Sequence, residues 1–233
     1  MEIKLTNESE HLPFDIHATK DPIFDLLPGI TVLTGCNGHG KSTTMKEIVK
    51  FMKDNNHPYL FYDATMHDVN TVTETNTLTY CLQASEGEQV YAIFSEFVAM
   101  IRKERERCKW AKHPLILLID GIDSGLSIDV IIEIRNFLCF ILDECIIQDV
   151  LPYICITSNS YELCNASGYF RAGKFEFDKS KHNEYVAKYF RCYDPHSFEY
   201  LQFSSYNDFY KYTMKTSKMK SERIAKMFKD SEK

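Results

Sequence analysis

One stretch of this chain constrains its fold more than any other. Residues 30–45 read ITVLTGCNGHGKSTTM, which is a short apolar run, a glycine-rich loop and a segment with helical spacing. Within it, Gly35, Gly40, Lys41 and Ser42 fit the pattern G-x-x-x-x-G-K-[ST], known as the P-loop. In this motif, backbone N–H groups surround a polyphosphate at the N-terminus of a helix. The sequence therefore predicts a phosphate-binding loop between a strand and a helix.

The motif also predicts the cofactors, ATP and Mg²⁺. Lys41 is expected to reach the β- and γ-phosphates and to act in catalysis. The hydroxyl of Ser42 is expected to bind Mg²⁺, a cation that prefers oxygen ligands. Further nucleotide contacts are expected from the other positions of the loop and the helix start, namely Asn37, Gly38, Gly40 and Thr43.

A second apolar run ends in a carboxylate. Residues 114–120 read PLILLID and predict a buried strand that ends at Asp120. In P-loop proteins, such a carboxylate reaches Mg²⁺ through water from the carboxyl end of a parallel strand. We therefore expect Asp120 to be a catalytic residue and, with Ser42, to hold the metal ion.

Strand and helix patterns alternate around these two motifs. Strands are expected at residues 2–6 and 14–18 as an antiparallel hairpin, at 58–62, at 153–157, and in a hairpin over 168–178. Helices are expected from residue 43, over 89–112 and over 127–147, and the aromatic-rich remainder also has a helical pattern. The alternation predicts an α/β fold, in which a mixed, largely parallel sheet has an N-terminal antiparallel portion and flanking helices.

The charge is unevenly distributed along the chain. The net charge is −6, but residues 211–233 hold seven lysines and one arginine against three acids, or +5, which leaves −11 for residues 1–210. We interpret residues 1–210 as one P-loop domain and residues 211–233 as a basic helical tail. A solvated terminal helix explains the tail; the alternative is a contact for nucleic acid or an acidic partner.

Composition restricts the setting of the protein. No apolar run approaches the roughly 18 residues that a membrane helix needs, so no membrane association is expected. The eight cysteines form no C-x-x-C pair and mostly lie in apolar segments. This usage is typical of a reducing compartment and predicts a cytoplasmic protein.

The loop sequence T-G-C-N-G-H-G-K-S-T resembles the P-loop of ABC-type ATPases, particularly the soluble SMC and RecF-like groups, whose loop reads G-x-N-G-x-G-K-S-T. Residues 85–89 (SEGEQ) stand where that family has its L-S-G-G-Q signature. Residues 121–127 (GIDSGLS) resemble its D-loop segment. The strand that ends at Thr157 is followed by Asn159, near the expected switch residue. The resemblance covers roughly residues 25–160.

This resemblance implies an ATPase that forms a homodimer around Mg-ATP. Ser85 and Gly87 of one subunit would contact the γ-phosphate bound by the other, and Asn159 would contact it within the same subunit. The dimer would switch a partner, either a nuclease or a nucleic acid, in a repair or defence setting.

The chain departs from the family at three points. Gly121 stands where the family has the glutamate that orients the attacking water. Asn159 replaces the switch histidine and can hydrogen-bond but carries no charge. Only 44 positions separate Lys41 from Ser85, too few for a coiled-coil arm. Three functions therefore remain open: a slowly hydrolysing ATPase, a non-hydrolysing ATP-binding assembly module, and a P-loop small-molecule kinase, which the absence of a recognisable arginine-rich lid disfavours.

Overall fold

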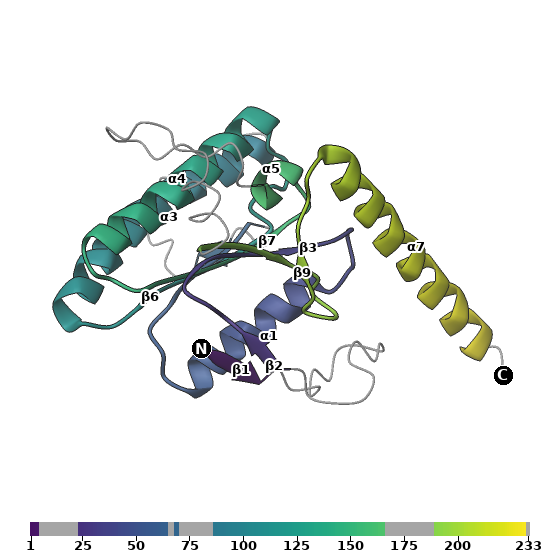
Figure 1. Ribbon diagram of the computed structural model, residues 1–233, viewed down its shortest axis with the longest axis horizontal. Coiled ribbons are helices and arrows are strands. Elements are labelled where there is room, and N and C mark those ends of the chain that lie inside the picture. Colours follow the sequence, from purple (N-terminus) through teal and green to yellow (C-terminus); the bar gives the residue numbers. More distant parts are fainter. Residues whose placement is uncertain (5–22, 65–67, 70–85, 166–188, 232–233) are drawn as a thin grey trace.

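The computed structural model describes residues 1–4, 23–64, 68–69, 86–165 and 189–231 of the chain (Figure 1). The expected strand at 14–18, the expected hairpin at 168–178 and Ser85 lie outside these ranges.

A seven-stranded sheet lies at the centre of the molecule (Figure 1), with the spatial order β5-β4-β6-β7-β3-β8-β9. The five inner strands are parallel, while β5 and β9 pair antiparallel at the two edges. The strands are β3 (Gly29–Thr34), β4 (Leu60–Asp63), β5 (Asp68–Val69), β6 (Leu115–Asp120), β7 (Pro152–Ser158), β8 (Phe190–Tyr193) and β9 (Tyr200–Leu201). A separate antiparallel pair is formed by β1 (Glu2–Lys4) and β2 (Ile23–Asp25).

Helices cover both faces of the sheet. The helices are α1 (Lys41–Asp54), α3 (Glu86–Ala111), α4 (Ile128–Ile147), α5 (Tyr161–Cys164) and α7 (Tyr206–Ser231). Figure 1 shows α3 and α4 over one face, and α1 with the β1–β2 pair over the other. The long helix α7 runs along the side of the molecule, past the loop that joins β3 to α1.

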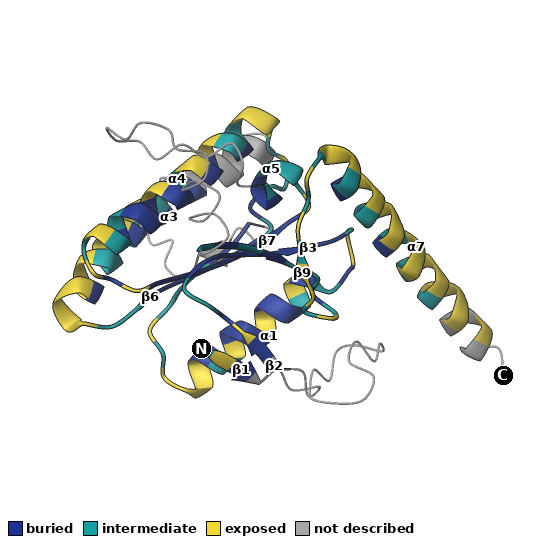
Figure 2. Ribbon diagram, viewed as in Figure 1, coloured by how far each residue is buried: buried dark blue, intermediate teal, exposed yellow. Residues whose placement is uncertain are grey.

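Strand β6 shows why its sequence folds this way. All six of its residues are buried (Figure 2). Leu117 and Ile119 belong to the core on the α3–α4 side, whereas Ile116 and Leu118 belong to the core on the α1 side. A parallel strand covered on both faces needs apolar side chains in both directions, and the continuous apolar run of β6 meets that need.

The structure confirms the predicted α/β class and the largely parallel sheet, and corrects several elements. The helix predicted from residue 89 begins at Glu86. Strand β1 pairs with β2, which the sequence did not predict, and the partner predicted at residues 14–18 lies outside the described residues. Strands β8 and β9 lie in a segment predicted to be helical. They are only four and two residues long, and pairing of β8 with the buried strand β3 determines their structure.

The predicted tail is not a separate unit. Helix α7 begins at Tyr206, so the expected boundary at residue 211 lies inside one helix. Its outer side is exposed, as a solvated helix requires, but Figure 2 shows less exposed residues along the side that faces the sheet. In the described part of the chain, no helix has the length and apolar character to cross a membrane.

Candidate functional site

The glycine-rich loop, residues 35–40, leads from the carboxyl end of β3 into the first turn of α1. Gly35 has a φ of 151°, and a Cβ atom there would lie 2.4 Å from the His39 ring. The loop therefore needs glycine at this position. The ammonium group of Lys41 donates to the carbonyl oxygens of Gly35 (2.8 Å) and Cys36 (2.9 Å), so the loop curves around the lysine.

Lys41 is a buried cation at the base of this loop, and only 8% of the residue is exposed. Burial lowers the pKa of its ammonium group below the ordinary lysine value, and the nearby carboxylates of Asp123 and Asp120 counteract part of that effect. An anion bound beside the ammonium group would favour its protonated form further. The loop is thus electrostatically suited to an anionic ligand.

Strand order brings Ser42 and Asp120 together. Strand β7 lies between β3 and β6, and the carboxyl ends of all three strands meet at one edge of the sheet. There the Ser42 hydroxyl donates to Asp120 Oδ1 at 3.1 Å. Thr157, from the end of β7, also donates to Asp120 Oδ1 and accepts from the Gly121 N–H at 2.8 Å. A hydroxyl and a carboxylate, both oxygen donors, therefore lie side by side.

Asp120 is held in an environment that disfavours its charge. Burial raises the pKa of its carboxyl group, and hydrogen bonds from Thr157 and Ser42 offset part of this rise. Asp63 lies opposite Asp120 in the β4–β6 register and raises the pKa further. A bound cation would relieve this repulsion between acidic groups.

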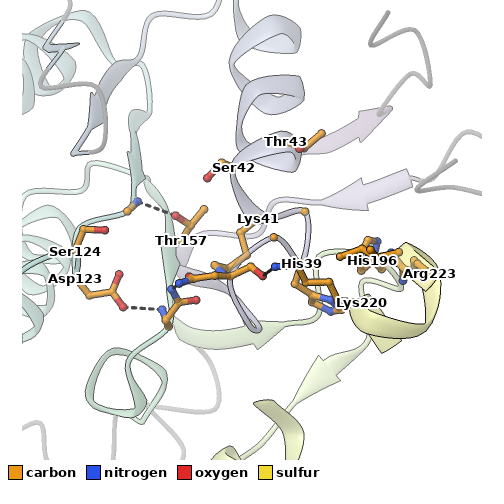
Figure 3. Close-up of a pocket in the computed structure, with 16 residues that line it drawn as sticks. His39, Lys41, Ser42, Thr43, Asp123, Ser124, Thr157, His196, Lys220 and Arg223 are labelled. Carbon is orange, nitrogen blue, oxygen red and sulfur yellow. Dashed lines mark hydrogen bonds between the residues drawn. The ribbon is translucent and has the colours of Figure 1, made fainter. Parts of the chain in front are cut away.

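A cavity of about 410 Å³ opens above the loop (Figure 3). Its lining residues come from the loop and α1, the segment after β6, the end of β7, the segment after β8, and α7: Asn37, Gly38, His39, Gly40, Lys41, Ser42, Thr43, Gly121, Asp123, Ser124, Thr157, Asn159, His196, Lys220, Arg223 and Ile224. In Figure 3, Lys41 stands between Asp123 and Ser124 on one side and Lys220 and Arg223 on the other.

One wall of the cavity is built by the segment after β6. Asp123 Oδ2 accepts from the Ser158 hydroxyl at 2.9 Å and from the Asn159 N–H at 2.6 Å. The Asn159 amide in turn donates to the side chain of Asn37 in the glycine-rich loop. This chain of hydrogen bonds joins the ends of β6 and β7 to the loop and places Asn159 at the cavity.

The opposite wall is organised by Asp194, which follows β8. His39 Nε2 lies 3.0 Å from Asp194 Oδ2, and the Tyr212 hydroxyl donates to the same oxygen at 2.6 Å. Burial alone would raise the pKa of the Asp194 carboxyl, but these hydrogen bonds and those from the backbone N–H groups of His196 and Ser197 hold it well below its usual value. Asp194 is therefore an ionised carboxylate, and its contacts with His39 and Tyr212 connect the glycine-rich loop to α7.

Helix α7 also contacts the loop directly. The Thr216 hydroxyl accepts from the Cys36 N–H at 3.2 Å, and Lys220 Nζ donates to the Asn37 carbonyl oxygen at 2.9 Å. Arg223 donates to His196 Nε2 at 3.2 Å. These contacts correct the interpretation of residues 211–233 as a fully solvated tail.

The structure gathers most of the predicted site residues. Asn37, Gly38, Gly40, Lys41, Ser42, Thr43 and Asn159 line the cavity, and Asp120 is bonded to Ser42 beneath it. Gly87 lies in the first turn of α3 and is not among the lining residues in the described part of the chain. Ser85 lies outside the described ranges.

Sequence reasoning missed the contribution of α7 to the site. Tyr212, Thr216 and Lys220 recur every four residues, which places them on one side of a helix. This regular spacing indicates that the three side chains lie on one helix face. The face was not predicted to be buried because its residues are polar, whereas buried helix faces are recognised by apolar residues.

A second group of potential metal ligands lies away from the cavity. One ligand atom each from Glu104, Cys108 and His113 lie within 4.8 Å of one another. Burial raises the pKa of the Cys108 thiol to about 11, and a metal ion needs the thiolate. Glu104 is already paired with Arg107 at 2.8 Å. This group therefore carries no functional assignment.

The fold and site together define an α/β protein with a cavity of about 410 Å³, lined by Lys41, Lys220 and Arg223, at the carboxyl edge of a largely parallel sheet. Comparison of the chain with protein-family models, with curated proteins and with solved structures found no match.

Proposed function

We propose that this protein binds Mg-ATP at the glycine-rich loop and acts as a slowly hydrolysing ATPase of the ABC type, which switches a partner. The observation that carries this proposal is the 3.1 Å contact between Ser42 and Asp120 beside the buried ammonium group of Lys41. These residues are 78 positions apart in the chain, and their contact supports the proposal because P-loop ATPases hold Mg²⁺ with a serine or threonine and an aspartate.

The residues at this point fit Mg²⁺. The Ser42 hydroxyl and the Asp120 carboxylate offer hard oxygen atoms, and Asp63 adds a second acidic group beside Asp120. When bound, Mg²⁺ would neutralise charge that develops on the phosphates. The Ser42 hydroxyl oxygen and the Asp120 carboxylate oxygen would then contact Mg²⁺ or its bound waters in place of the hydrogen bond between them.

The remaining residues have distinct roles in this proposal. Lys41 would exchange the Gly35 and Cys36 carbonyl oxygens for the β- and γ-phosphates. Asn159, already beside the loop through Asn37, would hydrogen-bond a γ-phosphate oxygen. Backbone N–H groups at the start of α1 would bind the other phosphate oxygens.

Hydrolysis needs a group that orients water, and Gly121 has no side chain to do so at the position where ABC-type ATPases have a glutamate. Gly121 has a φ of 68°, in the left-handed region that favours glycine. Its N–H is bonded to Thr157, which keeps the turn in this shape. Asp123 is the acidic residue in the cavity lining, but its Oδ2 is already bonded to Ser158 and Asn159. We therefore expect slow turnover.

The glycine at position 121 also favours a second candidate, a non-hydrolysing ATP-binding module that acts by assembly. Its backbone conformation favours glycine, and a protein that only binds ATP would need no water-orienting side chain there. The two candidates share the binding site and differ only in whether phosphate is released.

Dimerisation and partner binding rest on the resemblance to ABC-type ATPases. In that arrangement, the Ser85–Gly87 segment of a second copy would approach the γ-phosphate, and the dimer would engage a nuclease or a nucleic acid. The first turn of α3, which contains Gly87, offers backbone N–H groups that have no partner within the helix, and such groups can bind phosphate.

Isothermal titration with ATP, in the presence and absence of Mg²⁺, tests the proposal. The unaltered chain should bind Mg-ATP, and Lys41→Ala should abolish binding without lowering the melting temperature by more than a few degrees. Lys53→Ala, in the last turn of the same helix, is the matched control and should bind as the unaltered chain does. A folded, unaltered chain that does not bind Mg-ATP would show the proposal to be wrong.

A further inference from the structure

Helix α7 contributes a positively charged wall to the cavity. Lys220, Arg223 and Ile224 line it, although they lie some 180 positions after the glycine-rich loop. Figure 3 shows Lys220 and Arg223 on the side of the cavity opposite Asp123.

Lys220 is held in place by the helix that carries it. One turn earlier, Thr216 is 1% exposed and accepts from the Cys36 N–H. Two turns earlier, Tyr212 donates to Asp194. Because residues four apart share a helix side, these two anchors direct Lys220 at the same loop.

The loop is shaped to receive this lysine. Gly38 has a φ of 74°, and a Cβ atom there would lie 2.9 Å from Lys220 Nζ and 3.0 Å from its Cε. A side chain at this position would require the flexible end of Lys220 to shift, so glycine at position 38 gives the ammonium group room to lie against the loop.

Lys220 and Lys41 both donate hydrogen bonds from their ammonium groups to backbone carbonyl oxygens of the same loop. Lys41 donates to the carbonyl oxygens of residues 35 and 36, and Lys220 donates to that of residue 37. Both cations therefore lie on consecutive carbonyl groups of one loop. A lysine ammonium group has three N–H donors, so it can bond to the loop and to a ligand oxygen together.

Its helix neighbour Lys218 behaves differently. The Lys218 side chain is 79% exposed, and its ammonium group lies 3.9 Å from Glu222 on the same helix. Lys218 is therefore a surface lysine, whereas the side chain of Lys220 contacts the loop.

We propose that Lys220 binds the phosphates of the nucleotide from within the same chain, so that ATP ties α7 to the glycine-rich loop. Arg223, held by His196, adds a second cation beside it. The proposal rests on the proposed function, because it names a further ligand of the same nucleotide. It gives the basic C-terminal helix a role in sensing the nucleotide.

Isothermal titration of the full chain with Mg-ATP and with tripolyphosphate, which has phosphates but no base, tests this role. Lys220→Gln keeps an N–H donor near the Asn37 carbonyl oxygen but removes the charge. It should weaken the binding of both ligands by about tenfold, as expected for the loss of one charge-assisted hydrogen bond. Lys220→Arg should retain most of the affinity, and the control Lys218→Gln should bind as the unaltered chain does.

The outcomes separate this inference from the proposed function. If the unaltered chain binds ATP, Lys41→Ala abolishes binding and Lys220→Gln binds normally, Lys220 has only a structural role and the inference is wrong. If Lys220→Gln weakens ATP binding but leaves tripolyphosphate unaffected, Lys220 contacts the base or ribose and the phosphate assignment is wrong. If the unaltered chain binds neither ligand, the proposed function itself fails. Melting curves establish that each variant is folded.

Discussion

The Tyr212 hydroxyl donates a 2.6 Å hydrogen bond to Asp194 Oδ2 and lies 3.1 Å from the carbonyl oxygen of Thr34, the last residue of β3. This contact attaches α7 to the sheet. Tyr212→Phe should lower the free energy of unfolding by about 1–3 kcal/mol, because it removes a hydrogen bond to a carboxylate. Denaturant unfolding measures the change. Tyr210→Phe, on an exposed tyrosine of the same helix, should have little effect, and equal losses in both variants would contradict the role of Tyr212.

Asp194 should make stability depend on pH in the acidic range. Its hydrogen bonds hold the pKa of the folded state below that of the unfolded state. The stabilisation is therefore fully present above the unfolded pKa of about 4 and is lost as the pH falls below it. The difference in unfolding free energy between the unaltered chain and Asp194→Asn should be large at pH 7 and shrink below about pH 4. The exposed Asp149→Asn is the control, and a pH-independent difference for Asp194→Asn would refute this assignment.

Gly121 should tolerate few side chains. Because its φ is 68°, Gly121→Ala should lower the free energy of unfolding by about 1–2 kcal/mol. Gly121→Asn should cost less, since asparagine enters the left-handed region more readily. Thermal melting compares the two variants. If both are as stable as the unaltered chain, the turn after β6 is not constrained as the structure indicates.

Turnover should be slow, because nothing at position 121 can orient water. A positioned general base contributes about 10²- to 10⁴-fold, so Gly121→Glu should raise phosphate release within that range in spite of its cost in stability. Asp123→Asn, which keeps an oxygen acceptor for Ser158 and Asn159, should leave the slow rate nearly unchanged. Rapid hydrolysis by the unaltered chain that disappears in Asp123→Asn would instead identify Asp123 as the base.

ATP should promote a homodimer, because the Ser85–Gly87 segment can reach a γ-phosphate only from a second copy in the proposed arrangement. Light scattering with and without Mg-ATP measures the molecular mass. Ser85→Arg should bind nucleotide and stay monomeric. A chain that binds Mg-ATP yet remains monomeric would rule out the signature assignment while leaving the nucleotide site intact.

The sequence alone determined the parts of this protein that depend on local patterns. The buried strand at residues 115–120 was predictable because a strand covered on both faces reads as one apolar run. The helix over residues 128–147 was predictable from its apolar content, because its buried residues recur at helical spacing. The loop around Lys41 was predictable because glycine and lysine spacing encodes its geometry directly.

Tertiary structure alone decided which distant residues meet. Strand β8 is too short to be recognised by its own pattern and is stabilised by its parallel pairing with β3. Among the lysines of the basic C-terminal segment, Lys220 differs from Lys218 because it lies on the side of α7 that is attached to the end of β3 through Tyr212 and to the loop through Thr216. The four-residue spacing of Tyr212, Thr216 and Lys220 indicates a shared helix side but does not name its partner 180 positions away, because that contact depends on how strands are ordered in the sheet. For that reason, the glycine-rich loop was predictable from the sequence, whereas only the fold places α7 beside it.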